Sequence, residues 1–282
     1  MISNKDFNAF ESEYQKEEKE ILVLTSDSAG GACKFYDSWD CSKYFLAYVD
    51  VSSNEMKKGD GRINWLISEE ECREHGFIWP YRFKGGVIYR LKARELIDKT
   101  VPEGRLPSYY NRFMVVDVIE ENAHSNELLA MLAEYRKPVF VKDDVLGEFE
   151  LNKDLSVFGG AIGWLEEEIS VSMDVNTDDK DSWTKAINTL RILFLQQKKR
   201  DSEFRTFAAE KLTDLANDWL QDENAAEISK DDFAKRISLS ELCVDPSGRY
   251  TAYFDDDDMF LRHAVTVYGH IEKGLEYASI EG

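Results

Sequence analysis

Apolar and polar positions alternate most clearly in the second half of the chain. In the segment 168–175 every second position is apolar (Ile169, Val171, Met173 and Val175), with Ser170, Ser172 and Asp174 between them. This pattern predicts a strand with one buried face. Further strands are predicted over 147–151, 249–254, 259–268 and 275–280. The last two are expected to form a hairpin with a short turn over Lys273-Gly274.

The region between these strands, residues 182–220, has apolar residues at helical spacing instead. They form two stripes, and the polar stretch 196–201 between the stripes predicts a break in the helix. Asp201 or Ser202 is expected to cap the second helix. Asp181 is expected to cap the first helix, and Ser229 a shorter helix around Phe233.

The first half of the chain mixes helices and strands with longer polar connections. Helices are predicted over 5–19, 68–75 and 125–135; Ser68 and Glu71 have the spacing of a capping box, and Gly76 suits the end of that helix. Strands are predicted over 21–25, 44–51, 87–96, 112–120 and 139–141, with a loop over 26–40 and a polar turn over 54–61. This order predicts an α+β fold, with antiparallel sheets packed with helices. A change in composition near 136–144 divides the chain into two modules, 1–141 and 142–282.

Negative charge is concentrated in the second module. The 282 residues carry a formal net charge of -20. Residues 1–141 contain 24 acidic and 19 basic residues, a net charge of -5, and residues 142–282 contain 31 and 16, a net charge of -15. A surface of this sign repels phosphate backbones, so nucleic acid is not expected as a partner. It suits a basic protein surface or a cation, and plain solvation is the simplest alternative.

Other features of the sequence indicate a cytoplasmic protein without a cofactor. The four cysteines are scattered and no pair has C-x-x-C spacing, which argues for reduced thiols. Residues 1–20 are highly charged, and no apolar run has the length of a membrane span. The glycine-rich patterns that bind dinucleotides or nucleotide phosphates are absent from the sequence.

The acidic run Asp255–Asp258 is the most conspicuous candidate site. Four consecutive carboxylates prefer water, so the chain is expected to turn outward there and to return to the core at Met259. Asp256 and Asp258, with His263 further on, offer ligands for a divalent cation, which would make the protein a metal-assisted hydrolase or transferase. The competing interpretation is an exposed acidic turn followed by a core histidine.

Two weaker candidates lie elsewhere. Asp174-x-Asn176-x-Asp178 resembles the start of a calcium loop, but Asp179 replaces the required glycine and Lys185 the bidentate glutamate. A turn that leads into a helix is the favoured interpretation. Cys33, in the glycine-containing segment 26–33, is a conceivable nucleophile, but nothing in the sequence identifies a histidine as its base.

Several aromatic residues lie in predicted loops and are candidate binding anchors. Such side chains give a large contact area at little entropic cost, which is why interfaces favour them. Coverage of the edges of a small core is an equally good explanation. The residues are Trp39, Trp79, Tyr81, Tyr109 and Tyr110.

The second module resembles the bacterial family called domain of unknown function 2262. The resemblance lies in Gly147-Glu148-Phe149, in Phe158-Gly159-Gly160 with Trp164, in the segment 215–220, and in the closing pattern 253–260 with His263. It covers about residues 142–282. The family pattern implies one glycine within the acidic turn and another just before the histidine, where this chain has Asp257 and Arg262. The family has no assigned activity, so the resemblance implies no mechanism.

A non-catalytic protein-binding module is the favoured function. By analogy with small acidic bacterial proteins that act as antidotes to toxins, we expect an immunity-type protein that binds a basic partner. Its expected contact residues are Asp255, Asp256, Asp257 and Asp258, with Trp79, Tyr81, Tyr109 and Tyr110 as aromatic anchors. No nucleic acid, membrane or cofactor is expected to take part. The alternative is the metal-assisted enzyme that would use Asp256, Asp258 and His263.

Overall fold

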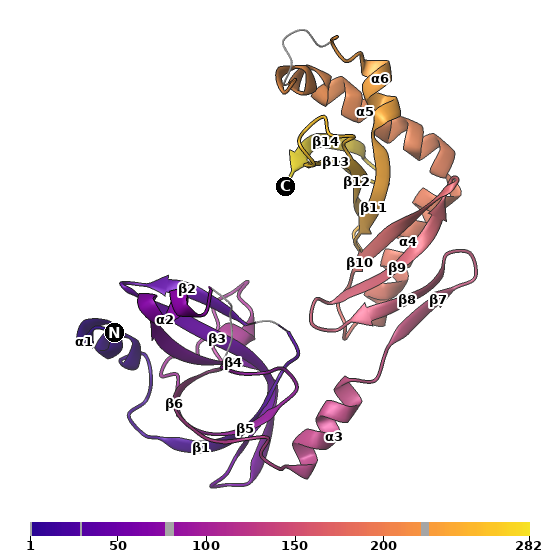
Figure 1. Ribbon diagram of the computed structural model, residues 1–282. Coiled ribbons are helices and arrows are strands. Elements are labelled where there is room, and N and C mark those ends of the chain that lie inside the picture. The colour runs from indigo at the N-terminus through magenta and orange to yellow at the C-terminus, as the bar shows by residue number, and fades with distance from the viewer. Residues whose placement is uncertain (1, 29, 77–81, 221–225) are drawn as a thin grey trace. The chain divides into compact units, whose positions relative to one another are not determined.

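The computed structural model describes residues 2–28, 30–76, 82–220 and 226–282, and it divides the chain into two compact units (Figure 1). Unit 1 is Met1–Lys137 and unit 2 is Pro138–Gly282. The boundary lies shortly before the predicted one, because the strand that begins at Phe140 already pairs with the next strand in the sheet of unit 2. Both units combine helices and strands, which gives the α+β class.

Unit 1 is built around a closed β-barrel. Its strands follow the order β1-β5-β6-β4-β3, and β3 pairs with β1 to close the ring. β4 and β6 are parallel, so the expectation of purely antiparallel sheets is wrong here. β2 extends the sheet beyond β3 as a hairpin. The strands are β1 (Lys19–Thr25), β2 (Gly31–Phe35), β3 (Ser38–Asp50), β4 (Glu55–Ser68), β5 (Ile88–Glu95) and β6 (Arg112–Glu121).

The five barrel strands have the topology of the OB fold. Numbered by their place along the chain within the barrel, they run 1-2-3-5-4-1, with the third and fifth strands parallel. Helix α2 (Glu69–Glu74) connects the third barrel strand to the fourth. Ser68 caps this helix through the Glu71 amide, as predicted, and Gly76 beyond it has φ +60°. A shared topology does not by itself assign a function.

Alternating side chains of the barrel strands fill its interior. Phe45, Trp65, Tyr89 and Phe113 are all at most 3% exposed and belong to one apolar cluster. Two helices cover outer surfaces of the barrel. Helix α1 (Asn4–Glu11) contributes to a cluster with residues of β4 and β6, and α3 (Asn126–Tyr135) packs on residues of β1, β3 and β5.

Unit 2 contains one sheet of eight strands. Its order is β14-β13-β12-β11-β10-β9-β8-β7, and all neighbours are antiparallel except β10 and β11. A parallel pair needs a long crossover, and helices α4, α5 and α6 provide it. The strands are β7 (Phe140–Asp143), β8 (Gly147–Asn152), β9 (Val157–Trp164), β10 (Glu167–Asp174), β11 (Ser238–Val244), β12 (Arg249–Asp255), β13 (Ala264–His270) and β14 (Gly274–Glu281).

The core of unit 2 lies between this sheet and its helices. The alternation predicted for β10 is confirmed: Ile169, Val171 and Met173 are at most 2% exposed and belong to the core cluster. Figure 1 shows α4 and α5 following one another along the sheet. The helices are α4 (Lys180–Leu195), α5 (Gln197–Asp218) and α6 (Lys230–Arg236), with Ser229 as the predicted cap of α6.

Several predicted elements differ from the structure. The predicted loop 26–40 contains the hairpin of β2 and β3, and most of the predicted turn 54–61 belongs to β4. The predicted helix 5–19 ends at Glu11, because the chain then returns to pair Tyr14 with Leu96. β9 and β11 were not predicted, and β13 starts at Ala264 rather than at residue 259.

The predicted cap of the second long helix in unit 2 also differs from the structure. The break in the long helical region lies at Gln196, within the predicted stretch 196–201, but the second helix begins before the predicted caps Asp201 and Ser202. Asp201 lies within α5, where it accepts hydrogen bonds from Trp164 Nε1 at 3.3 Å and Arg205 Nε at 2.6 Å. Its carboxylate therefore connects the sheet to α5, and Asp201 does not cap that helix.

Candidate functional site

The acidic run forms the turn after β12, and its second aspartate points inward. Asp256 is only 5% exposed. Its carboxylate accepts hydrogen bonds from the backbone N–H groups of Asp258, Phe260 and Arg262, at 3.2, 2.6 and 3.3 Å. The expectation that all four carboxylates face water is therefore wrong for Asp256. Three backbone donors use most of its capacity to accept hydrogen bonds, so the residue organises the turn.

Two other aspartates of the run have cationic partners. Arg236 Nε lies 2.6 Å from a carboxylate oxygen of Asp257 and its terminal nitrogen donates to the carbonyl of the same residue at 2.9 Å. Arg262 lies 3.7 Å from Asp258, with both side chains largely exposed. The turn therefore presents much less negative charge than its sequence suggests.

His263 is packed against an aromatic residue and not directed at the aspartates. Its ring lies 5.5 Å from that of Trp219, and its Nδ1 lies 2.6 Å from the carbonyl oxygen of Phe260. Asp256, Asp258 and His263 consequently do not form a ligand set. Among the residues that the structure describes, no three Asp, Glu, His or Cys side chains are grouped to hold a metal ion.

The backbone of this turn explains the glycines that the family pattern implies. Asp257, Asp258, Leu261 and Arg262 have φ values of +49°, +58°, +55° and +73°. Glycine adopts this left-handed region at little cost, whereas other residues are strained there. Asp257 and Arg262 are the two positions at which the pattern implies glycine. That pattern therefore reflects the shape of the turn and needs no ligand to explain it.

The calcium-like segment is a helix-capping turn. Asn176 accepts a hydrogen bond from the Asp178 amide at 3.1 Å, and Asp179 accepts one from the Asp181 amide at 2.9 Å. Asp179 is therefore the N-cap of α4, two residues before the predicted Asp181. Lys185 forms an ion pair with Asp181 at 2.7 Å, so the ammonium group of a lysine already supplies positive charge to this segment.

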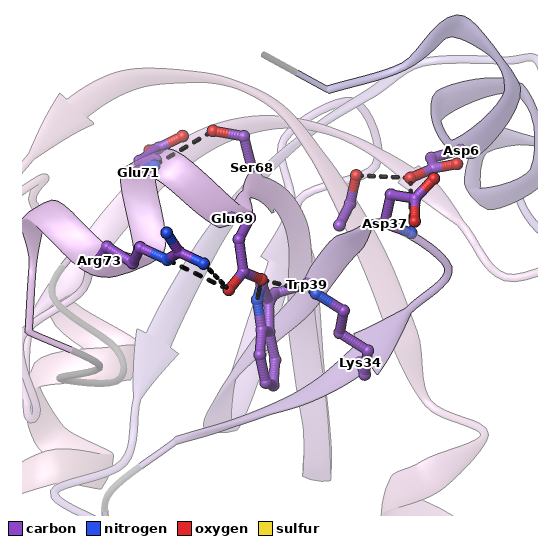
Figure 2. A network of polar contacts seen from close by, with 9 residues as sticks. Asp6, Lys34, Asp37, Trp39, Ser68, Glu69, Glu71 and Arg73 are labelled. Atoms are coloured by element: carbon purple, nitrogen blue, oxygen red, sulfur yellow. Dashed lines mark hydrogen bonds and ion pairs between the residues drawn. The ribbon is translucent and has the colours of Figure 1, made fainter.

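Trp39 lies in strand β3 and not in a loop (Figure 2). Its indole N–H donates to Glu69 at 2.7 Å, and Lys34 Nζ lies 4.7 Å from its ring centroid and 2.6 Å from Glu69. Hydrogen bonds from Lys34 and Trp39 lower the pKa of Glu69. This arrangement holds α2 against the β2–β3 hairpin, which gives Trp39 a structural role.

Two of the remaining predicted aromatic anchors, Tyr109 and Tyr110, lie just before β6. Tyr109, in the short helix η1 (Pro107–Tyr109), is 47% exposed, and the guanidinium carbon of Arg62 lies 3.7 Å from its ring centroid. Tyr110 is half-buried. Trp79 and Tyr81 lie outside the described residues. Tyr109 thus remains the one exposed anchor of this group that the structure describes.

Cys33 lacks the surroundings of a nucleophile. It is paired with Asp40 across the β2–β3 hairpin. Burial, and then the negative charge of Asp40, raise the pKa of its thiol. A reactive cysteine needs the opposite shift.

The sheet of unit 2 has a second face, opposite its core, that the sequence did not single out as a site. Register places polar side chains of β10 to β14 beside one another in two rows, and we call these residues the open face. One row is Ser172, Cys243, Thr251, Tyr268 and Tyr277, and the other is Ser170, Glu241, Tyr253, Thr266 and Ser279. The neighbouring residues of the same strands belong to the core that packs on the helices.

A hollow of about 400 Å³ lies at one end of the open face. The rings of Tyr268 and Tyr277 are stacked there, with centroids 4.1 Å apart and planes inclined by 15°. Burial, and then the negative charge of Asp245, raise the pKa of Asp174. The polar hollow is lined by Asp174, Cys243, Asp245, Arg249, Thr251, Tyr268, Glu276 and Tyr277, together with neighbouring backbone.

The polar hollow carries more negative than positive charge. Its lining has three carboxylates, from Asp174, Asp245 and Glu276, and one guanidinium, from Arg249. Asp245 also organises the β11–β12 turn, because it accepts hydrogen bonds from the amides of two residues of that turn. Carboxylates beside tyrosine rings attract a cationic side chain by charge and by the ring quadrupole.

Comparison with known proteins finds, for each unit, a matching family model whose description gives no function. Residues 143–280 match the family described as "Uncharacterized protein conserved in bacteria (DUF2262)", which confirms the resemblance expected for the second module. Residues 6–135 match the family described as "Domain of unknown function (DUF7021)". No curated protein matches the chain. Among the described residues, no helix is long and apolar enough to cross a membrane.

Proposed function

We propose that the protein is a non-catalytic binding protein, of the immunity type, whose unit 2 binds a basic partner protein through the open face and its polar hollow. The observation that carries this proposal is the hollow itself. Carboxylates of Asp174 and Glu276 and the exposed ring of Tyr277, which is 51% exposed, line one concavity. A lysine or arginine side chain of a partner fits that chemistry.

The proposed contact surface lies outside the acidic run Asp255–Asp258. Asp256 is buried and Asp257 is paired with Arg236, so these two carboxylates are not free to contact a partner. Asp174 and Glu276 form no ion pair within the described part of the chain. Burial, and then the negative charge of Asp245, raise the pKa of Asp174, and a cation that enters the hollow would favour its charged form.

The open face around the hollow suits a protein interface. Apart from Thr266, which is fully buried, its serine, threonine and tyrosine side chains supply donors and acceptors with little entropy to lose, and tyrosine is enriched among residues that dominate binding. The negative potential would accelerate encounter with a basic surface. All four cysteines are free thiols, which supports a reducing compartment, and we therefore place the protein in the cytoplasm.

A pull-down from the source bacterium with matched variants tests this proposal. Wild type, Tyr277→Ala and Asp174→Asn are compared with Asp255→Asn, which removes the same charge from an exposed position outside the hollow. We expect a stoichiometric basic partner that wild type and Asp255→Asn retain. Truncation of an aromatic anchor should weaken the reconstituted complex about 30-fold, since a residue of this kind contributes about 2 kcal/mol.

Calorimetry with the purified partner then gives the affinities. Equal affinity for wild type and both hollow variants would show that the open face is not the interface. The absence of any stoichiometric partner in cells that express the protein would contradict the binding function itself.

A further inference from the structure

Strand β14 is a free edge of the sheet of unit 2. It is the last strand in the sheet order and, among the described residues, it pairs only with β13. Its core side is also less covered than that of its neighbour. Val265 and Val267 on β13 are fully buried, whereas Ala278 and Ile280 on β14 are half-buried against the same core. The strand contains no lysine or proline, the residues that commonly protect such an edge from pairing.

A groove of about 420 Å³ lies on the core side of this edge and is lined by residues of α5 and β14. Its apolar lining comes from Phe207 on α5 and Leu275 on β14, and both side chains pack against the core of unit 2. Arg200 and Glu203 in the groove are paired with each other at 3.2 Å, and Glu210 adds an exposed carboxylate. Apolar side chains of an added strand would enter this groove and cover the half-buried residues of β14.

The polar hollow borders the opposite side of the same edge. β14 contributes Glu276 and Tyr277 to its lining. These consecutive residues both reach the hollow because the pairing with β13 skips Glu276, which is the extra residue of a β-bulge. β14 therefore has a partly apolar groove on one side and a negatively charged hollow on the other.

We propose that an extended segment of the basic partner protein, with lysine or arginine alternating with apolar residues, adds a strand to β14. Successive side chains of a strand point to opposite sides of its sheet, so the cationic ones would enter the hollow and the apolar ones the groove. The outer N–H and C=O groups of β14 would pair with the backbone of the segment. This inference rests on the proposed function and specifies how the partner is recognised. Glu276 and Glu281 on β14 oppose pairing with the same strand of a second copy, because like charges would meet.

A synthetic peptide tests strand addition without the natural partner. The probe is the acetylated and amidated heptapeptide Lys-Val-Lys-Val-Lys-Val-Lys, which is titrated into the isotope-labelled full chain. One control peptide carries an N-methyl group on each internal backbone nitrogen, which removes the hydrogen-bond donors and keeps the charge. A second control, Lys-Lys-Lys-Lys-Val-Val-Val, has the same composition without the alternation.

Two protein variants separate the hollow from charge in general. Glu276→Lys reverses a charge in the hollow, and Asp255→Lys makes the same change at an exposed position outside both concavities. We expect saturable binding of the alternating peptide by wild type and Asp255→Lys, with slower hydrogen exchange of β14 amides and cross-strand NOEs to the peptide. Binding should be about tenfold weaker for the N-methylated peptide, since one or two lost hydrogen bonds correspond to about that factor. Glu276→Lys should weaken binding of the alternating peptide by a similar factor.

Equal affinity for the alternating and N-methylated peptides, with unchanged exchange in β14, would overturn strand addition and leave the hollow as a site for a cationic side chain. Equal affinity for the alternating and block sequences would refute the assignment of one set of side chains to each concavity. No saturable binding of the alternating peptide, or a dimer in sedimentation that protects β14 without peptide, would also overturn the inference. The pull-down tests the proposed function independently, because it recovers a partner whatever its mode of recognition.

Discussion

Replacement of Asp256 tests whether the acidic run is a structural turn. Its carboxylate satisfies three backbone N–H groups, and the Phe260 amide belongs to a residue that is fully buried. A hydrogen bond to a charged group is worth about 1.5–3 kcal/mol, and a buried donor left without a partner loses that amount. The other two amides can recover part of theirs from water. Asp256→Ala should therefore lower the free energy of unfolding of unit 2 by about 3–5 kcal/mol. Asp256→Asn keeps one acceptor oxygen and should lose about half of that.

Urea unfolding followed by circular dichroism measures the overall loss. Hydrogen exchange of the Val265 and Val267 amides locates it, because these residues belong to the core strand that follows the turn. The control is Asp255→Asn, which removes the same charge from the exposed neighbour and should change the unfolding free energy by no more than about 0.5 kcal/mol. Equal losses in the Asp255 and Asp256 variants would refute the reasoning, since charge alone would then explain both.

Three further perturbations follow from the same structure. Burial raises the pKa of Asp143, but backbone donors and Arg191 lower it by more, so the net shift is downward. The stabilisation from this carboxylate is therefore present above the unfolded-state pKa and is lost as pH falls through the folded-state pKa. Asp143→Asn should cost about 1–3 kcal/mol in thermal unfolding at pH 7, and the difference from wild type should shrink as pH falls through the folded-state pKa. Arg262→Gly should be neutral or more stable by up to about 1 kcal/mol, whereas Arg262→Val should be less stable by about 1–2 kcal/mol, as measured by melting temperature, because φ is +73° there. Gly61→Ala should destabilise unit 1 by about 1–3 kcal/mol in urea unfolding, because its methyl group would collide with the ring of Phe45 and with the backbone carbonyl of Asn111; an unchanged midpoint would show that both groups move freely.

Local patterns in the sequence predict most of the individual elements. The alternation 168–175, the capping box at Ser68 and the helix 126–135 depend on neighbouring residues only, and the structure has all three. β9 was not predicted because its exposed positions include Gly159 and Gly163, and glycines at such positions are typical of a loop. The hairpin of β2 was missed for the same reason, since Gly31 begins the strand.

Strand pairing could not be predicted in the same way. The closure of β3 onto β1 and the parallel β4–β6 and β10–β11 pairs join segments far apart in the chain. No turn between neighbouring strands specifies them. The order of strands also decides which polar positions meet, so the open face of unit 2 cannot be recognised from β10 alone, although the polar side of β10 is plain in the sequence.

The candidate sites, like the strand pairing, could not be predicted from local sequence patterns alone. A run of four aspartates predicts that all four side chains are exposed to solvent. The backbone turn instead buries Asp256 and leaves Asp255 exposed. A tyrosine such as Tyr109 was identified as exposed from its loop position, but its partner Arg62 lies in a strand far away in sequence. No local signal joins them.

The distribution of charge within each unit therefore matters more than the net charge of the chain. Screening limits an exposed charge to a range of about 8–10 Å at physiological salt, so a partner responds to the groups around its contact and not to the total of -20. Some carboxylates of unit 2 have cationic partners, as at Asp257 and Asp143. Asp174 and Glu276 lack such partners and line a concavity with Tyr277.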